Sequence, residues 1–178
     1  MDSRSRHEST SAPRGWKRRL RRWSFDAFVI AAILMAIGWW QTRDLVAAGQ
    51  PAPSLSMASL DGGQESLTPA GSKPLILYFF APWCGVCAAT SHTVRALHRD
   101  PDTDVIAVAL SYQSRGQVAQ YAREQGLDEV PVLLGSTTAA RAFRVSSFPT
   151  FYVLDEQRNV RSRTVGYTTE LGLRLRAL

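Results

Sequence analysis

The fold of this chain is set by the stretch Leu75-Ile-Leu-Tyr-Phe-Phe80-Ala-Pro-Trp-Cys84-Gly-Val-Cys87. Residues 75–80 form an unbroken apolar run, which is typical of a strand that is buried on both faces. Two cysteines separated by two residues follow at once, and residues 87–99 carry apolar side chains at helical spacing. The sequence therefore predicts a buried strand that leads through a cysteine pair into a helix.

The alternation of strands and helices continues on both sides of this stretch. Before it, Asp61-Gly62 predicts a turn between hairpin strands at 55–60 and 64–67. After it, strands are predicted at 105–110, 130–134, 150–154 and 160–165, and helices at 116–125, 138–143 and 170–178. We therefore expect an α/β domain whose central mixed sheet is flanked by helices.

The position of the cysteine pair predicts redox chemistry. Cys84 lies where free backbone N–H groups and the helix dipole favour an anion, so we expect its pKa to fall below the usual value of about 8.5. Cys87 follows one helical turn later, at a distance that a disulfide can span. Cys84 would then attack the disulfide of a partner, and Cys87 would resolve the mixed disulfide. The alternative, an inert disulfide, would close so short a loop that it would stabilise the fold little.

Other uses of the two thiols fit the spacing less well. His92 and His98 lie downstream on the same predicted helix, but their spacing from the cysteines is not that of zinc ligands. Covalent haem needs a histidine directly after the second cysteine, and residue 88 is alanine. A Cu(I)-binding module remains open, because thiolates are soft ligands. We expect no resident metal and no dissociable cofactor.

Composition and charge narrow the class of protein further. The 178 residues have a formal net charge of +6, which by itself would suggest a nucleic-acid partner. Residues 1–22, however, hold eight basic and two acidic side chains, and the remaining 156 residues hold thirteen of each. The excess charge is thus confined to a short tail, for which we expect no regular structure, and no nucleic-acid partner is expected.

An apolar run near the N-terminus predicts a membrane anchor. Residues 27–40 are uncharged, and the anchor reaches a sufficient length only when it is counted from 23 to 42. Trp23 at one end and Trp39-Trp40 at the other suit the two membrane interfaces. The alternatives are a signal peptide cleaved near Val46-Ala47-Ala48, and a buried core helix, which the missing polar face argues against.

The basic tail predicts the orientation of this anchor. Six basic residues between residues 14 and 22 are expected to stay in the cytoplasm. The predicted organisation is therefore a basic cytoplasmic tail (1–22), a transmembrane helix (23–42), a linker (43–53) and a periplasmic domain (54–178). The protein would be a single-pass protein of the inner membrane.

Two motifs resemble the thioredoxin superfamily. The segment from Phe79 to Cys87, with Trp83 before the first cysteine, resembles its active site, and Phe148-Pro149-Thr150 resembles its cis-proline segment. The resemblance implies a thioredoxin-like fold, a cis bond at Pro149, and a substrate groove formed by Trp83, Phe148 and Pro149. An extended substrate segment would pair with the backbone at Phe148. An aromatic residue beside an exposed site favours a substrate contact for Trp83, and core packing is the alternative.

Weaker matches narrow the resemblance to one branch. Residues 49–53 and 130–134 resemble the membrane-anchored TlpA-like branch, and the ending 166–176 is similar to its suppressor-of-copper-sensitivity (ScsD) type. Two departures concern proton transfer. Reducing thioredoxins carry a buried acid six residues before the first cysteine, where this chain has Tyr78, and cytochrome-maturation relatives often carry Glu where it has Thr90. The direction of electron flow therefore stays open.

Together these features predict a periplasm-facing thiol–disulfide oxidoreductase that acts on protein substrates. Cys84 would be the nucleophile and Cys87 the resolving thiol, and a membrane electron-transfer partner would supply electrons. The glycine after Cys84 resembles reducing thioredoxins and favours reduction or disulfide isomerisation. A dithiol oxidase of the same fold and the Cu(I)-binding module are the alternatives.

Overall fold

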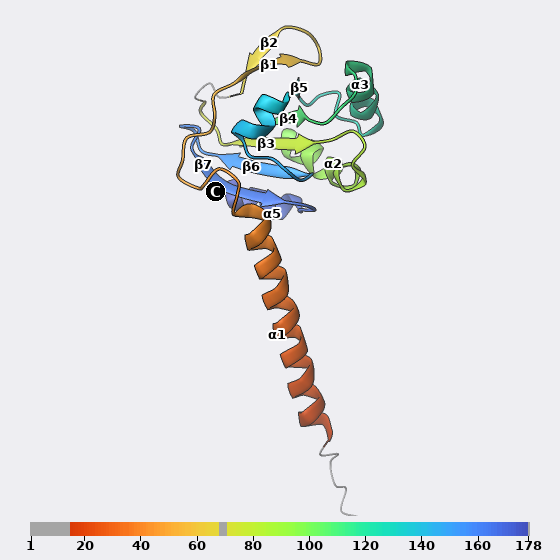
Figure 1. Cartoon of the computed structure of the whole chain (residues 1–178), viewed down its shortest axis with the longest axis vertical. Coiled ribbons are helices and arrows are strands. Elements are labelled where there is room, and N and C mark those ends of the chain that lie inside the picture. Colours follow the sequence, from red (N-terminus) through yellow and green to blue (C-terminus); the bar gives the residue numbers. More distant parts are fainter. Residues whose placement is uncertain (1–14, 68–70, 178) are drawn as a thin grey trace, which may run out of the picture. The chain divides into compact units, whose positions relative to one another are not determined.

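A computed structural model describes residues 15–67 and 71–177, and side chains at 15–22, 24, 25 and 34 are left undescribed. One seven-stranded sheet has the strand order β2-β1-β5-β4-β3-β6-β7 (Figure 1). Its strands are β1 (Ser56–Ser59), β2 (Gln64–Ser66), β3 (Leu75–Phe80), β4 (Asp104–Ala109), β5 (Val132–Leu134), β6 (Thr150–Leu154) and β7 (Val160–Val165). The helices are α1 (Gly15–Thr42), α2 (Gly85–His98), α3 (Arg115–Glu124), α4 (Thr137–Ala142) and α5 (Glu170–Ala177).

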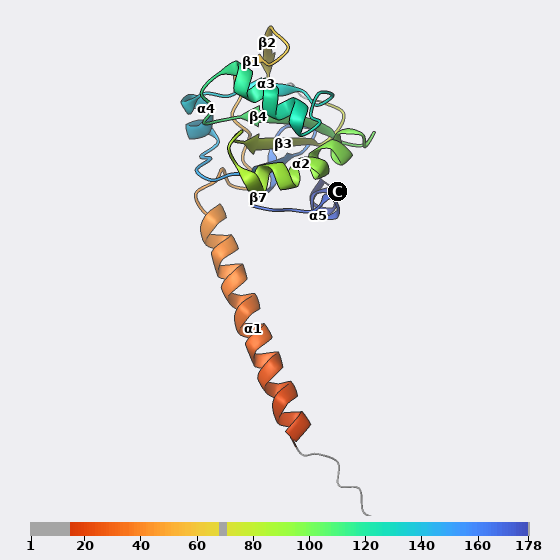
Figure 2. The ribbon, with the colours of Figure 1, turned by 90° about the vertical axis from the view of Figure 1, so that its right-hand side faces the viewer.

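The central strand β3 is parallel to β4 and antiparallel to β6, which makes the sheet mixed as predicted. All six side chains of β3 are buried, as its apolar run predicted, and they alternate between two cores. Tyr78 and its alternate neighbours face α2, α3 and α5, whereas Phe79 and its neighbours face α4. Figure 2 looks onto the side of the sheet that α2 and α3 cover. The side of the sheet that Tyr78 faces is called the α2 side, and the side that Phe79 faces is called the α4 side.

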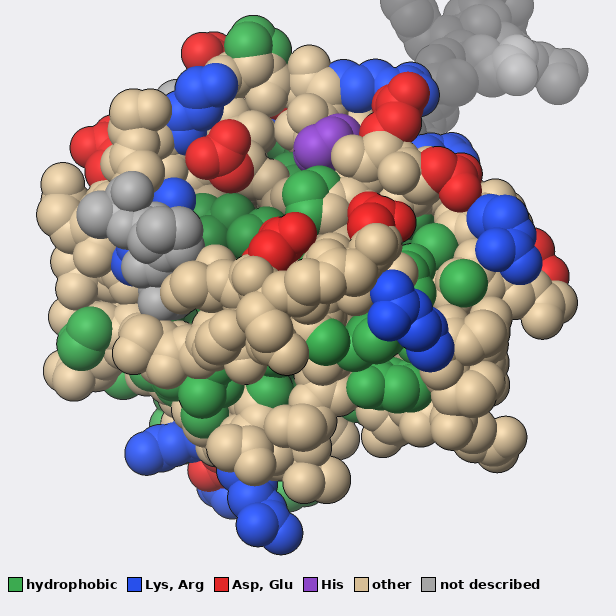
Figure 3. Space-filling model, turned by 90° about the horizontal axis from the view of Figure 1, so that it is seen from above, with side chains coloured by type: hydrophobic (Ala, Val, Ile, Leu, Met, Phe, Trp, Pro, Cys, Tyr) green, Lys and Arg blue, Asp and Glu red, His purple; other side chains and the backbone are tan. Residues whose placement is uncertain are grey.

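The predicted elements are found with small changes at their ends. The N-terminal hairpin pairs β1 with β2, and β6 with β7 forms the predicted closing hairpin. Gly126 follows α3 with a φ of +64°, a left-handed conformation that suits the glycine predicted to close this helix. On the face seen in Figure 3, acidic and basic side chains are interspersed around exposed hydrophobic ones, without a broad area of one charge.

The segment predicted as a linker, residues 43–53, is held against the domain. Leu45 is buried in the core on the α4 side. The Val46 N–H donates to the Tyr152 hydroxyl at 3.1 Å, and the Ala52 N–H donates to the Arg158 carbonyl at 2.9 Å. Ordered packing therefore begins at Leu45, ahead of the predicted domain boundary at residue 54.

Helix α1 includes the predicted anchor at 23–42. It already begins at Gly15, so residues 15–22 are helical although we expected no regular structure there, while residues 1–14 lie outside the described residues. Lys, Arg, Leu and Trp all tolerate a helix, and a helix extends readily once it has begun. Within the part of the chain that the structure describes, no helix has the length and apolarity needed to cross a membrane. The chain divides into two compact units, 1–37 and 38–178.

Candidate active site

Cys84 and Cys87 form a disulfide at the start of α2, with their Cα atoms 5.2 Å apart. Cys84 is the N-cap of this helix: its backbone is extended, and its sulfur accepts a hydrogen bond from the Cys87 N–H at 3.2 Å. Cys84 is 8% exposed, whereas Cys87 is fully buried. The pair is therefore asymmetric, with one sulfur at the surface of the helix end and the other behind it.

This geometry explains which sulfur can carry charge. The first backbone N–H groups of a helix lack intrahelical partners, and they face the N-cap position. In the reduced protein, a thiolate at Cys84 would be stabilised by these donors and by the positive end of the helix dipole. Cys87 is fully buried behind Cys84 in the disulfide-bonded protein, so Cys84 is the more accessible of the two sulfurs.

Trp83 lies beside the pair and is 64% exposed. Its indole N–H donates to the Ser111 carbonyl at 2.9 Å, and its ring meets the Phe148 ring edge to face with a centroid distance of 5.9 Å. Ser111 has a φ of +50° and was not predicted as a site residue, because a backbone carbonyl leaves no signature in a sequence. The structure thus orients the tryptophan at the surface and does not bury it in the core.

The cis bond that the resemblance implied is present between Phe148 and Pro149. The Pro149 carbonyl accepts the Gly166 N–H at 2.8 Å, which ties this segment to the end of β7. Phe148 packs against the core that contains Cys84 and Cys87. The fold therefore brings Phe148, which precedes the cis bond to Pro149, against Trp83 and the core that holds the cysteines, although the two segments lie more than sixty positions apart.

Three buried hydroxyl groups lie behind Cys87. The hydroxyls of Tyr78 and Ser91 both donate to the Cys87 carbonyl at 3.0 Å, and the Ser91 and Tyr121 hydroxyls lie 3.2 Å apart. Burial is the main reason that the pKa values of Tyr78 and Tyr121 lie above their usual range. Ser91, four residues after Cys87, could have been found from helical spacing, whereas nothing in the sequence links Tyr121 to the site.

The described residues hold no cluster of three or more His, Cys, Asp or Glu side chains that could bind a metal ion. The two sulfurs of Cys84 and Cys87 exchange two electrons when they form or break their bond. A mixed sheet, a Cys-x-x-Cys pair at a helix start and a cis-proline beside it define a thioredoxin-like thiol–disulfide oxidoreductase.

Comparisons with known proteins agree with this class. Residues 48–163 match the AhpC/TSA family, and the chain belongs to that family. The thioredoxin-like protein YneN of Bacillus subtilis is 30% identical over 161 residues, which are 85% of this chain and 94% of YneN. The thiol-disulfide oxidoreductase ResA of Geobacillus thermodenitrificans is 22% identical over 151 residues, 80% of this chain and 86% of ResA.

A solved structure agrees as well. The thiol:disulfide interchange protein of the thioredoxin family from Chlorobium tepidum superposes with a TM-score of 0.63 at 26% identity, covering 74% of this chain and 96% of that one. The fold and the relatives together identify the chain as a thiol–disulfide oxidoreductase.

Proposed function

We propose that Cys84 is the attacking nucleophile and Cys87 the resolving thiol of a protein disulfide reductase or isomerase. The Cys84 thiolate attacks a substrate disulfide, so that a mixed disulfide forms and one substrate thiolate leaves. Cys87 then attacks the Cys84 sulfur, which closes the Cys84–Cys87 disulfide and releases the second substrate thiolate. The observation that carries this assignment is the asymmetry of the pair, with Cys84 capping α2 and Cys87 fully buried.

The assignment is tested with the two single serine variants. Cys84→Ser should not reduce insulin or reshuffle scrambled ribonuclease, and Cys87→Ser should accumulate a mixed disulfide with the substrate. In the reduced protein, Cys84 should be alkylated faster than Cys87 at mildly acidic pH. Equal alkylation rates, or turnover by Cys84→Ser as fast as by the parent, would refute the assignment.

The substrate groove in this proposal is formed by Trp83, Phe148 and Pro149. An extended substrate segment would lie along the Phe148 backbone, with an apolar side chain against the exposed Trp83 ring. The groove is supported by the contact between Trp83 and Phe148 and by their place beside Cys84. Protein substrates fit it better than small thiols, because a small thiol gains nothing from an aromatic platform.

We further propose that the enzyme works in the reducing or isomerising direction. The support is Gly85 after the first cysteine, a feature that resembles reducing thioredoxins. A membrane electron-transfer partner would re-reduce the pair. The reduction potential of the Cys84–Cys87 pair tests the direction: a value near about −270 mV supports a reductase, and one near about −120 mV would identify an oxidase instead.

We also propose that residues 23–42 anchor the enzyme in the inner membrane, with the N-terminus in the cytoplasm and the catalytic domain in the periplasm. The proposal rests on the apolar run, the flanking tryptophans and the basic tail. It is also supported by the large apolar side chains of α1 that are exposed, among them Trp23, Phe28, Met35 and Trp39. A reporter enzyme that works only outside the cytosol, fused after residue 178, should be active. A reporter active only in the cytosol would refute this topology.

A further inference from the structure

The hydroxyl cluster behind Cys87 takes no part in the exchange as written above, yet it is built from three different elements. Tyr78 comes from β3, Ser91 from α2 and Tyr121 from α3. All three side chains are buried, and two of the hydroxyls donate to the carbonyl of the resolving cysteine. The Ser91 hydroxyl donates to that carbonyl and also lies within hydrogen-bond distance of the Tyr121 hydroxyl. The Cys87 carbonyl, in the first turn of α2, thus accepts one hydroxyl from β3 and one from α2 itself.

This surrounding is electrically neutral. Among the described residues, the only buried charged side chain is Arg158, which donates to the Lys73 carbonyl before β3, whereas Cys87 follows β3. Helix α5 packs on α2, but its Arg174 forms ion pairs with Glu170 and with Asp100. Asp100 lies thirteen residues after Cys87, about 20 Å along the direction of a helix.

The remaining charged or titratable groups of the packed helices point to solvent or lie toward their far ends. On α2 and α3 they are His92, Arg95, His98, Arg115, Arg123 and Glu124, and none of them has a hydrogen bond or ion pair with Cys87 or the cluster. β3 carries no charged residue at all. Tyr78 and Tyr121 cannot accept the proton of Cys87, because burial keeps both phenols protonated at neutral pH.

Resting on the proposed roles of the two cysteines, we propose that Tyr78, Ser91 and Tyr121 are positioning residues that orient Cys87 toward the mixed disulfide, and that no side chain among the described residues acts as its internal base. In the mixed-disulfide state, in which the Cys84–Cys87 bond is open, Cys87 loses its proton to water, and its thiolate attacks the Cys84 sulfur. The Cys84–Cys87 bond forms as the bond from Cys84 to the substrate sulfur breaks. The substrate leaves as a thiolate, which takes a proton from water when its own pKa requires one.

The two steps can be followed separately in the reduced full-length protein with dithiobis(nitrobenzoate), an aromatic disulfide that releases a coloured thiolate at each step. The first phase reports attack by Cys84, and the second reports resolution by Cys87. Tyr78→Phe removes one hydroxyl and keeps the ring, so it should slow the second phase about fivefold, the loss expected for one hydrogen bond, and leave the first phase unchanged. Ser91→Ala should do the same and provides a second variant if Tyr78→Phe does not fold.

Tyr152→Phe is the matched control. Tyr152 is also a fully buried tyrosine, but its hydroxyl bonds the Phe143 carbonyl and the Val46 N–H on the α4 side of the sheet. Its loss should leave both phases unchanged. A second phase that is unaffected by Tyr78→Phe and Ser91→Ala, or slowed equally by Tyr152→Phe, would overturn the positioning role.

The pH profile tests the absence of an internal base. Below the pKa of a buried thiol, the second-phase rate should rise tenfold per pH unit from about pH 5 to 8, because only the thiolate attacks. An inflection in this range would reveal a titrating side chain and overturn that half of the proposal. Failure of the proposed roles of the two cysteines would give a different result in the same assay. Either Cys84→Ser would still show the first phase, or Cys87→Ser would still show the second phase.

Discussion

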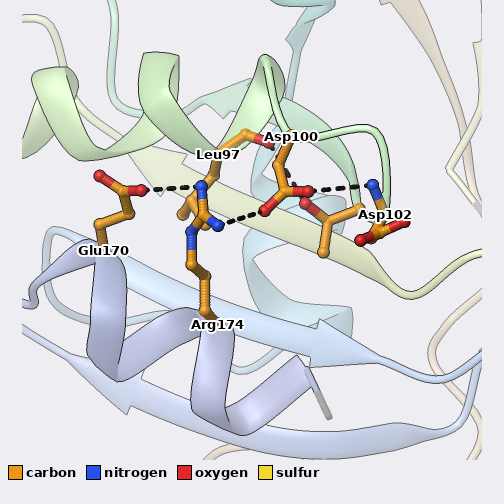
Figure 4. Close-up of polar contacts among 6 residues, drawn as sticks. Leu97, Asp100, Asp102, Glu170 and Arg174 are labelled. Carbon is orange, nitrogen blue, oxygen red and sulfur yellow. Dashed lines mark hydrogen bonds and ion pairs between the residues drawn. The ribbon is translucent and has the colours of Figure 1, made fainter.

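Arg174 joins the last helix to the far end of the helix that carries the cysteines. Its guanidinium contacts Asp100 at 2.9 Å and Glu170 at 2.8 Å, and both contacts are visible in Figure 4. The Asp100 side chain is only 10% exposed and also accepts the Asp102 N–H at 3.0 Å, whereas Arg174 and Glu170 are each about four-tenths exposed. Arg174→Met should therefore destabilise the domain mainly by leaving the Asp100 carboxylate without its cation.

The expected loss follows from these exposures. An exposed pair four residues apart on a helix contributes about 0.3–0.5 kcal/mol. The Asp100 pair lies between an exposed pair, worth about 1 kcal/mol or less, and a buried pair, whose rupture costs about 3–5 kcal/mol, so we assign it about 1.5 kcal/mol. Together the loss is about 2 kcal/mol, which lowers the melting temperature of a domain of this size by about 8 °C.

The assay is urea and thermal unfolding of the full-length chain in detergent, followed by circular dichroism. Arg176→Met is the matched control, because Arg176 lies on the same helix, is exposed and forms no ion pair with another described residue. Arg174→Met should lose about 2 kcal/mol and Arg176→Met less than about 0.5 kcal/mol. In about 1 M salt the gap between them should shrink. Equal losses for the two variants would refute the reasoning.

Three further outcomes are expected from single contacts. Burial raises the pKa of Tyr152 to about 12, so the stability that its protonated hydroxyl contributes is complete below the unfolded pKa of about 10 and is lost as the pH rises through 12. Alkaline unfolding of Tyr152→Phe should therefore lack this part of the pH dependence, and a profile identical to that of the parent would contradict this prediction. Gly135→Ala should lower the free energy of unfolding in urea by about 1–3 kcal/mol, because the added Cβ would lie 2.7 Å from a Leu110 methyl group. Gly85→Ala should lower it little, because no atom lies within 4 Å of the added Cβ, and a reversed order of the two losses would contradict the packing argument. Trp83→Phe loses the hydrogen bond to the Ser111 carbonyl, so kcat/KM for insulin should fall about fivefold while the alkylation rate of Cys84 stays the same. A changed alkylation rate would show that Trp83 acts on the cysteine instead.

The order and type of the helices and strands were predictable because the hydrophobic pattern of each element lies within a short stretch of the chain. The unbroken apolar run at 75–80 can be satisfied only by a strand with both faces covered, and it is the central strand β3. The closing hairpin, with strands at 150–154 and 160–165, is found at its predicted bounds. The packing of Leu45 into the core could not be foreseen, because the alanines and prolines of residues 43–53 have no strand or helix pattern and look like a linker.

For the site, local pattern sufficed to identify the two cysteines and their place at a helix start, since two intervening residues and one helical turn are properties of the chain alone. The neighbours of Cys87, in contrast, are decided by the tertiary structure. Tyr121 reaches Ser91 across thirty positions, and Trp83 is held by a carbonyl twenty-eight residues away, through contacts that arise only when helices pack on a sheet. Spacing along a chain specifies a helix face, but the partner of that face depends on how the layers pack, and the hydroxyl groups around Cys87 were brought there by that packing.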